Sequence, residues 1–271
     1  SSPARIQSRG VTRVELQLAG RRVLVSAGGA GIGRAIVGLL HGAGARLHCC
    51  DVDPASLEAL RRELPGVGTT LCDVADPAAV ERLFAEAGAT LGGLDALVNN
   101  AGIAGPTGAV EETSIEAWQQ TLGVNLSSMF YCARLAVPLL KAAGGGAIVN
   151  MSSAAGRFGY PLRAPYAASK WGVVGLSHTL AAELGRFNIR SHALLPGPVG
   201  GPRIDRVIQA KAEARGIPVE TMRESYLDMT AMHAFVSAED VAGLVLYLLS
   251  DAGRLVSGQA IGVDAATTYI R

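Results

Sequence analysis

Short apolar runs of the kind that form buried β-strands alternate with longer segments of helical spacing along almost the whole chain. Strands that alternate with helices build a parallel sheet with helices on both faces, and such a sheet binds ligands beyond the carboxyl ends of its strands. We therefore predict an α/β fold: a doubly wound, Rossmann-like sheet of seven parallel strands flanked by helices, in a single domain. The predicted strands are residues 22–26, 46–50, 69–72, 94–99, 147–152, 189–195 and 260–264, and the predicted helices are residues 32–40, 54–64, 77–87, about 114–143 and 164–187.

The length of the chain, 271 residues, fits one domain of this class. We place the domain at residues 21–271, after an N-terminal extension at residues 1–20. Residues 197–237 break the alternation, contain three prolines, and form too long a stretch for an ordinary loop. We expect this segment, called the lid below, to carry short helices of its own and to cover a substrate site.

The charge balance and the apolar content exclude several classes of protein. Lys and Arg number 24 against 23 Asp and Glu, so a partner held by charge, such as nucleic acid, is not expected. No apolar stretch reaches the ~18 residues of a membrane span, and residues 1–20 lack the apolar core of a signal peptide. The four cysteines stand in apolar stretches without the spacing of metal ligands, which predicts buried thiols, no metal and a reducing compartment. We expect a cytoplasmic protein whose partner is a small molecule.

A glycine-rich turn, residues 26–33 (SAGGAGIG), joins the first predicted strand to the first predicted helix. Glycine permits the tight turn, lets the backbone approach a pyrophosphate, and lets the helix pack close to the strand. The helix N-terminus then offers free N–H groups and a partial positive charge to the phosphates. The spacing alone also fits the nucleoside site of a methyltransferase. The residues predicted to contact a dinucleotide here are Ser26, Gly28, Gly29, Gly31, Ile32 and Gly33.

An acidic residue, Asp51, ends the second predicted strand, where a carboxylate accepts hydrogen bonds from the ribose hydroxyl of a bound adenosine. The same carboxylate repels a 2′-phosphate, and the neighbouring Ala30 and Val52 offer no positive charge to hold one. NAD is therefore predicted rather than NADP. Asp73, at the end of the third strand, is predicted to accept from the adenine amino group, with Val52 and Val74 beside the same adenosine.

Tyr166 and Lys170 stand four apart in a predicted helix, so their side chains share one face. A free tyrosine has a pKa of ~10, too high for a base at neutral pH. Lowering that pKa by ~3 units takes ~4 kcal/mol, which one ammonium at ~4 Å supplies at an effective dielectric constant of ~20. The pair therefore predicts a tyrosine that removes or delivers the proton of an alcohol.

With this pair and several further motifs, residues 22–264 resemble the short-chain dehydrogenase/reductase family. Residues 26–33 are similar to the family's T-G-x-x-x-G-I-G, with Ser26 and Ala27 in place of Thr and Gly. The other matches are Asn99-Asn100-Ala101-Gly102 for N-N-A-G, Asn125 for the helix Asn, Ser153 for the catalytic Ser, Tyr166-Ala167-Ala168-Ser169-Lys170 for Y-x-A-S-K, and Pro196-Gly197 for P-G. So many motifs in one order exclude the methyltransferase interpretation.

The resemblance implies roles for four residues, of which Tyr166 would be the general acid/base. Lys170 would lower the pKa of Tyr166 and hold the nicotinamide ribose. Ser153 would hydrogen-bond the reacting oxygen of the substrate, and Asn125 would hold a water that links Lys170 to solvent. The further cofactor contacts that it implies are Asn99, Ala101, Gly102, Pro196, Gly197 and Val199.

The function that the resemblance implies is an NAD-dependent oxidoreductase acting on a secondary alcohol or a ketone, assembled as a homotetramer or a homodimer. A catalytically silent NAD sensor or scaffold on the same fold is the alternative, but it would have no chemical need for all four residues. Two departures from the family pattern bear on the cofactor site. Ala27 carries a Cβ that is tolerated if its φ is negative, and Gly201 stands where the family often has a threonine.

The substrate pocket is expected between residues 104–107, residues 154–160 and the lid. Four arginines fall in or near these segments, and arginine suits bidentate recognition of a carboxylate. The favoured substrates are sugars, polyols and hydroxy acids. One of these arginines could anchor the carboxylate of a hydroxy acid or sugar acid; the alternative is that all four are solvated loop arginines. The predicted substrate contacts are Ala104, Arg157, Tyr160, Arg163, Arg203 and His233, and Arg206 is the fourth arginine.

Overall fold

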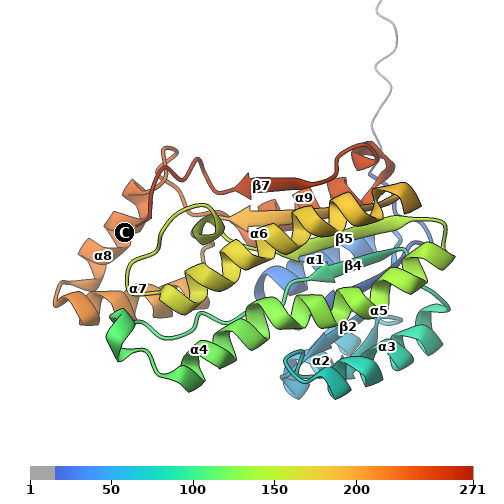
Figure 1. The fold of residues 1–271 in the computed structure, drawn as a ribbon, viewed down its shortest axis with the longest axis horizontal. Coiled ribbons are helices and arrows are strands. Elements are labelled where there is room, and N and C mark those ends of the chain that lie inside the picture. Colours follow the sequence, from blue (N-terminus) through green and yellow to red (C-terminus); the bar gives the residue numbers. More distant parts are fainter. Residues whose placement is uncertain (1–15, 271) are drawn as a thin grey trace, which may run out of the picture.

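The protein is described by a computed structural model over residues 16–270, and its centre is a sheet of seven parallel strands in the order β3-β2-β1-β4-β5-β6-β7. The chain builds the sheet outward from β1 to β3, returns to the other side of β1 with β4, and continues outward to β7 (Figure 1). This confirms the predicted doubly wound fold and places its reversal of strand order between β1 and β4. The strands are β1 (Arg22–Ser26), β2 (Arg46–Asp51), β3 (Gly68–Leu71), β4 (Ala96–Asn99), β5 (Gly146–Met151), β6 (Ile189–Pro196) and β7 (Gln259–Val263).

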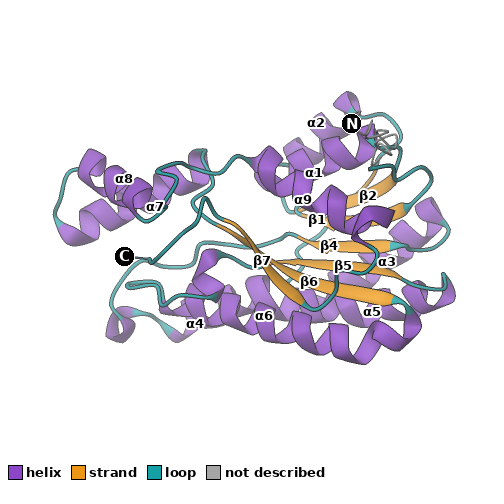
Figure 2. Cartoon of the chain, turned by 90° about the horizontal axis from the view of Figure 1, so that it is seen from above, coloured by secondary structure: helices purple, strands orange, loops and turns teal. Residues whose placement is uncertain are grey.

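Helices cover both faces of the sheet (Figure 2). α1 and α9 pack against each other on one face, whereas α4, α5 and α6 lie on the other, with α3 beside α5. The α-helices of the described chain are α1 (Gly31–Gly42), α2 (Pro54–Glu63), α3 (Pro77–Leu91), α4 (Ile115–Leu122), α5 (Ser128–Ala142), α6 (Ala164–Leu184), α7 (Pro202–Arg215), α8 (Val219–Asp228) and α9 (Ala238–Leu249).

The strands are buried on both sides because successive side chains of a strand point to opposite faces. In β1, Val23 and Val25 belong to the apolar core beneath α1 and α9, whereas Leu24 belongs to the core beneath α3 and α5. β4 repeats the pattern, with Val98 in the first core and Leu97 in the second. Two-sided burial holds the strands in place and thereby positions the turns at their carboxyl ends, where the site lies.

The helix predicted at about 114–143 is divided in the structure. α4 ends at Leu122, residues 123–127 form a π-helical turn, and α5 begins at Ser128. Such a turn inserts an extra residue into a helix and is frequent at functional sites. The sequence pattern shows no sign of it, because helical spacing continues on both sides.

The predicted N-terminal extension lies mostly outside the described residues, which begin at Leu16. Leu18 is already buried in the core, and its backbone N–H donates to the carbonyl oxygen of Ala43 at 2.9 Å. The packed domain therefore begins before residue 21. In the part of the chain that the structure describes, no helix is long and apolar enough to cross a membrane.

The predicted lid contains two helices, α7 and α8, which pack against each other beyond one end of the sheet (Figure 2). α7 starts with Pro202 in its first turn and ends at Gly216, whose φ of +63° favours glycine, so it is longer than the short helices expected. The two helices surround a small apolar core of their own, made of Ile208, Ala212, Met222, Tyr226 and Met229. The two helices of the lid therefore have a core of their own, whereas Val199 and Val236, near the ends of the lid, pack in the core beneath α1 and α9.

Candidate active site

A cavity of about 570 Å³ lies at the carboxyl ends of the strands, next to the reversal of strand order between β1 and β4. Residues that follow β1, β4, β5 and β6 line it together with Asp51 at the end of β2, and the lid closes it on the other side. The predicted site residues that line this cavity are Gly31, Ile32, Asp51, Gly102, Ala104, Ser153, Tyr160, Arg163, Tyr166, Lys170, Pro196, Gly197, Val199 and Arg203. The parallel sheet thus brings these distant segments to one place.

The glycine-rich turn after β1 has no room for a side chain at Gly28, Gly29 or Gly33. An ideal Cβ at Gly33 would lie 1.9 Å from the carbonyl oxygen of Ala27, and one at Gly28 would lie 2.7 Å from the Cβ of Cys49. Gly31 has a φ of +54°, in the left-handed region that favours glycine. These close contacts bring the N-terminus of α1 against the end of β1, with its unpaired N–H groups at the cavity. The turn therefore has the shape and polarity that a dinucleotide pyrophosphate requires.

A negative φ was the condition under which the Cβ of Ala27 would be tolerated in this turn. The structure does not meet this condition, because φ of Ala27 is +51°. A side chain in the left-handed region costs roughly 1–2 kcal/mol. The turn is held from β4, because Nδ2 of Asn100 donates to the carbonyl oxygens of Ser26 (3.2 Å) and Ala27 (3.0 Å). Oγ of Ser26 in return accepts from the backbone N–H groups of Asn100 and Ala101. Sequence reasoning missed Asn100, although its place as the second Asn of the N-N-A-G motif was a usable signal.

Asp51 lines the cavity beside the glycine-rich turn. Its carboxylate accepts hydrogen bonds from the backbone N–H groups of Gly29 (3.0 Å) and Asp53 (3.2 Å). A carboxylate offers about four acceptor positions, so these two bonds leave room for a hydroxyl of a ligand. The residue therefore fits the predicted contact with a ribose.

Nine residues predicted to contact the cofactor are absent from the cavity lining: Ser26, Gly28, Gly29 and Gly33 of the glycine-rich turn, and Val52, Asp73, Val74, Asn99 and Ala101. Val52 is 65% exposed, Asp73 is exposed and accepts from a nearby backbone N–H, and Val74 is buried. Asn99 is buried, and its Nδ2 donates to Oδ1 of Asn150 at 2.8 Å, within the sheet. Neighbouring residues at a strand end point in opposite directions, so Asn99 and Asn100 have different surroundings.

The end of β6 supplies a further part of the cavity wall. An ideal Cβ at Gly197 would lie 2.7 Å from Cα of Asp264, so the backbone after β6 passes close to that after β7. Gly201 lines the cavity with a φ of +130°, which side chains rarely adopt. The absence of a threonine at this position therefore follows from the backbone conformation.

The groups with acid/base chemistry meet where α6 approaches the end of β5. Nζ of Lys170 lies 5.6 Å from the centre of the Tyr166 ring and donates to the carbonyl oxygen of Met151 at 2.8 Å. Ser153, which follows β5, hydrogen-bonds Tyr166. An ideal Cβ at Gly102 would lie 3.4 Å from Nζ of Lys170, so the loop after β4 passes beside the ammonium. The structure thus brings the predicted Tyr, Lys and Ser into one cluster.

Burial and charge act in opposite directions on the Tyr166 hydroxyl. Burial by itself raises its pKa. The positive charge of Lys170, then that of Arg203, the hydrogen bond with Ser153 and the charge of Arg163 outweigh burial, so the pKa of Tyr166 is lowered from its ordinary value. Burial lowers the pKa of Lys170 to about 8, while a phenolate at Tyr166 raises it. The site therefore makes the Tyr166 hydroxyl more acidic than that of a free tyrosine.

Asn125 lies in the π-helical turn and is fully buried. Its Oδ1 accepts from the backbone N–H of Ile103 at 2.7 Å, and its Nδ2 donates to the carbonyl oxygen of Ile103 (3.0 Å) and to Oγ of Ser169 (3.1 Å). These bonds hold the loop that carries Gly102 against α6. Both N–H donors of this side chain are thereby used for positioning, and its predicted contact with a water stays a prediction.

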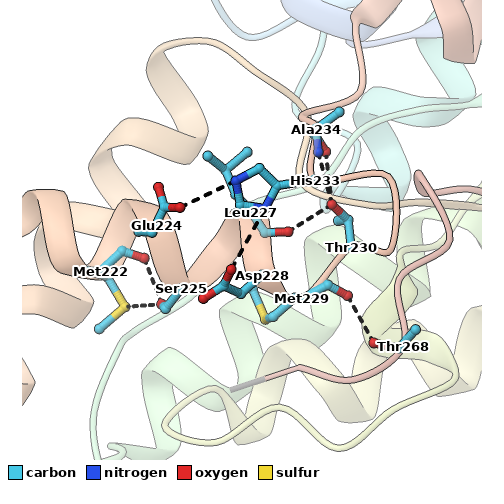
Figure 3. A network of polar contacts seen from close by, with 10 residues as sticks. All are labelled: Met222, Glu224, Ser225, Leu227, Asp228, Met229, Thr230, His233, Ala234 and Thr268. Carbon is cyan, nitrogen blue, oxygen red and sulfur yellow. Dashed lines mark hydrogen bonds and ion pairs between the residues drawn. The ribbon is translucent and has the colours of Figure 1, made fainter.

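Two predicted substrate contacts have partners outside the cavity lining. Arg157 forms an ion pair with Asp264, beyond the end of β7. The side chain of His233 is 55% exposed, and its ring nitrogens lie 3.3 Å from the carboxylate of Glu224 and 3.7 Å from that of Asp228 (Figure 3). Both acids belong to α8, so His233 links the end of the lid to α8. Neither side chain is placed to hold a substrate in the cavity.

A Tyr and a Lys on one helix face, a Ser on the facing strand end, and a glycine-rich turn shaped for a dinucleotide define a nucleotide-dependent dehydrogenase or reductase. The family model described as enoyl-(acyl carrier protein) reductase matches residues 27–268. The chain belongs to the short-chain dehydrogenase/reductase family, whose members use NAD or NADP, and it is an oxidoreductase.

Known proteins of similar sequence are dehydrogenases and reductases of alcohols and ketones. The 2,5-dichloro-2,5-cyclohexadiene-1,4-diol dehydrogenase of Sphingobium indicum is 34% identical over 256 residues, which cover 93% of this chain and 99% of that protein. The D-beta-hydroxybutyrate dehydrogenase of Rhizobium meliloti is 32% identical over 92% of this chain and 98% of its own length. The crystal structure of levodione reductase superimposes with a TM-score of 0.86 at 29% identity, over 92% of this chain and 98% of that one.

Proposed function

We propose that this protein is an NAD-dependent oxidoreductase that interconverts a secondary alcohol and a ketone, with Tyr166 as its general acid/base. The observation that carries the proposal is the surroundings of Tyr166, which lines the cavity within reach of Ser153 and of the Lys170 ammonium. A tyrosine whose pKa is lowered by positive charge is suited to accept a proton from an alcohol near neutral pH.

Each residue of the cluster has a separate task in this reaction. NAD, held by the glycine-rich turn and Asp51, would supply the acceptor for the hydride of the alcohol carbon. Ser153 accepts a hydrogen bond from the backbone N–H of Ala155 at 3.2 Å, and its own O–H, which contacts Tyr166 in the free protein, would turn to the substrate oxygen when a substrate binds. Tyr166 as phenolate accepts the hydroxyl proton during oxidation and returns it during reduction. Lys170, anchored by the carbonyl of Met151, stabilises that phenolate.

A catalytically silent NAD sensor on the same fold is the competing function. The experiment that separates the two combines the protein, NAD and a panel of secondary alcohols, polyols and hydroxy acids, and follows NADH by absorbance. Turnover of one of these classes supports the proposed oxidoreductase. Tight binding of NAD without turnover of any compound supports the sensor.

Replacement of Asp51 is expected to change the choice of cofactor. In Asp51→Asn the amide oxygen keeps the bond from Gly29, but the charge that repels a 2′-phosphate is removed. A hydrogen bond to a charged group is worth about 1.5–3 kcal/mol, so kcat/KM with NAD should fall about tenfold or more. The ratio of kcat/KM for NAD to that for NADP should fall further, because NADP is no longer repelled. An unchanged ratio in steady-state assays with both cofactors would contradict the role of Asp51.

The pH dependence of the reaction is expected to follow the two coupled groups. Oxidation needs Tyr166 deprotonated, and the pKa of Tyr166 is lowered, so the rate should rise with pH and level off below the pH at which a free tyrosine ionises. Arg203 lowers the pKa of both Tyr166 and Lys170. In Arg203→Gln both pKa values therefore rise, and the profile of kcat/KM against pH should move to higher pH. Arg186→Gln, an exposed arginine after α6, is the control and should leave the profile in place.

We also propose an assembly of identical chains, a homotetramer or a homodimer. The support is a set of exposed apolar side chains on the helices of one face: Ile115 on α4 (71% exposed), Phe130 on α5 (52%) and Trp171 on α6 (52%). Apolar side chains gathered on one surface are typical of protein interfaces. A cytoplasmic location is supported by the four free and buried cysteines.

A further inference from the structure

One buried cation in the cavity wall lacks an acidic partner. Arg163 is 2% exposed, and none of the ion pairs among residues 16–270 involves it. Its Nη2 donates to the carbonyl oxygen of Ala104, whereas Nε and Nη1 are buried without a hydrogen-bond partner. A buried charge with unsatisfied donors is strongly unfavourable unless a ligand completes its contacts. The observation therefore points to an anion that binds in the cavity.

The position of the guanidinium shows which part of a ligand this anion would be. Cζ of Arg163 lies 5.1 Å from the centre of the Tyr166 ring and 5.3 Å from that of Tyr160. Arg163 lines the same cavity as Ser153 and Lys170, so a ligand that contacts the guanidinium lies near the place of proton transfer. The hydroxyl of Tyr160 is hydrogen-bonded to that of Tyr226 from the lid at 2.6 Å, and both tyrosines line the cavity. An anion held by Arg163 would therefore lie between these tyrosines and the reacting carbon.

The charges around this end of the cavity have one sign. Arg203 and Arg206, at the start of α7, line the cavity together with Arg163. Among the described residues that line it, Asp51 is the one acid, and it lies beside the glycine-rich turn at the cofactor end. A neutral polyol would leave the buried guanidinium without a counter-charge. A carboxylate supplies that charge and two acceptors that match the planar N–H donors of arginine.

We infer that Arg163 binds the carboxylate of the substrate, which makes the substrate a short hydroxy acid or the corresponding keto acid. This inference rests on the proposed function, because it concerns the same reaction at the same tyrosine. It narrows the substrate to acids whose carboxylate lies within a few bonds of the carbon that is oxidised.

The test compares acids with neutral analogues in Arg163→Met. The substrates are lactate, glycerate and 3-hydroxybutyrate, each beside its amide. In the wild type the best acid should be preferred over its amide. In Arg163→Met the kcat/KM for the amide should fall moderately at a fixed pH, because loss of the Arg163 charge raises the pKa of Tyr166. The kcat/KM for the acid should fall about a hundredfold further, mainly through KM. Arg163→Lys keeps the charge without the planar donors, so its kcat/KM for the acid should lie between those of the wild type and Arg163→Met.

The matched control is Arg186→Met, the same substitution beyond the opposite end of α6, where the side chain is exposed. It should leave the preference for acids unchanged. Equal use of acid and amide by the wild type, or an equal loss for both in Arg163→Met, would overturn the inference. Turnover of the amide by Arg163→Met also shows that this variant is folded.

A binding measurement separates this inference from the proposed function. Malonate, which cannot be oxidised at an alcohol, should raise the melting temperature of the NADH-bound wild type, and malonamide should not. Arg163→Met should lose the response. If the wild type turns over none of the compounds, but Arg163→Met still loses the response to malonate, the proposed oxidoreductase is refuted and the anion site is supported. If neutral alcohols are turned over and Arg163→Met has no effect on acids, the oxidoreductase is supported and the anion site is refuted. Stronger stabilisation by inorganic phosphate than by malonate would overturn the assignment to a carboxylate.

Discussion

Tyr166→Phe is expected to lower the rate of oxidation by roughly 10³-fold or more, because the variant keeps the ring and loses only the group that carries the proton. The ring itself should remain in place, since it packs edge-on against Tyr160 with ring centres 6.1 Å apart and beneath the guanidinium of Arg163 at 5.1 Å. The affinity for NAD should therefore change little. Steady-state rates together with a titration of NAD by fluorescence measure both effects.

Tyr131→Phe is the matched control for that substitution. Tyr131 lies on α5, where it packs against the core beneath α3 and α5 and makes an edge-on contact with Phe130. Removal of its hydroxyl should leave turnover unchanged. Retention of more than about a tenth of the wild-type rate by Tyr166→Phe would show that another group moves the proton, since general acid/base catalysis contributes about 10²–10⁴-fold.

Gly33→Ala is expected to disrupt the cofactor site by overpacking. The added Cβ would lie 1.9 Å from the carbonyl oxygen of Ala27 and 2.6 Å from Nδ2 of Asn100, and the first of these is backbone that cannot rotate away. α1 must then move from β1, at a cost of about 1–3 kcal/mol or more. We expect a melting temperature lower by roughly 5 °C and an affinity for NAD weaker by about tenfold or more, because the helix N-terminus is displaced.

Gly38→Ala makes the same chemical change one turn and a half further along α1. There the nearest atom to the new Cβ is Nη1 of Arg34 at 3.5 Å, an ordinary contact. Alanine in a helix interior is favoured over glycine by about 0.5–1 kcal/mol, so this control should be as stable as the wild type or more stable. Equal melting temperatures and equal NAD affinities for the two variants would mean that the turn has more room than the structure shows.

Much of the fold could be predicted because its signals are local. β1 and β5 are continuous apolar runs, as expected of strands buried on both faces, and the helices between strands have regular spacing. The bounds of the strands differ by a residue or two, as in β3, which begins at Gly68, whereas α3 ends four residues later than predicted and α6 ends three residues earlier. The π-helical turn that carries Asn125 was not predictable, since its extra residue leaves the apolar spacing on both sides intact.

The substrate end of the site was much less predictable, because an arginine looks the same in a sequence whether it is buried or exposed. Arg157 and Arg163 are six residues apart in the chain. Arg157 pairs with Asp264 from the region of β7, whereas Arg163 is buried against Tyr166 and Ala104. Whether each arginine is buried or exposed depends on the segments from elsewhere in the chain that pack against it.

The sequence by itself determined the parallel α/β architecture, the glycine-rich turn and the pairing of Tyr166 with Lys170, because each depends on spacing within a few residues. The tertiary structure alone decided which Asn of the N-N-A-G motif holds the turn, that Ala27 adopts a positive φ, and that Arg163 faces the cavity without a counter-charge. These features depend on burial and on partners from distant strands. Local spacing carries no information about either, so they appear only when the sheet and the lid enclose the site.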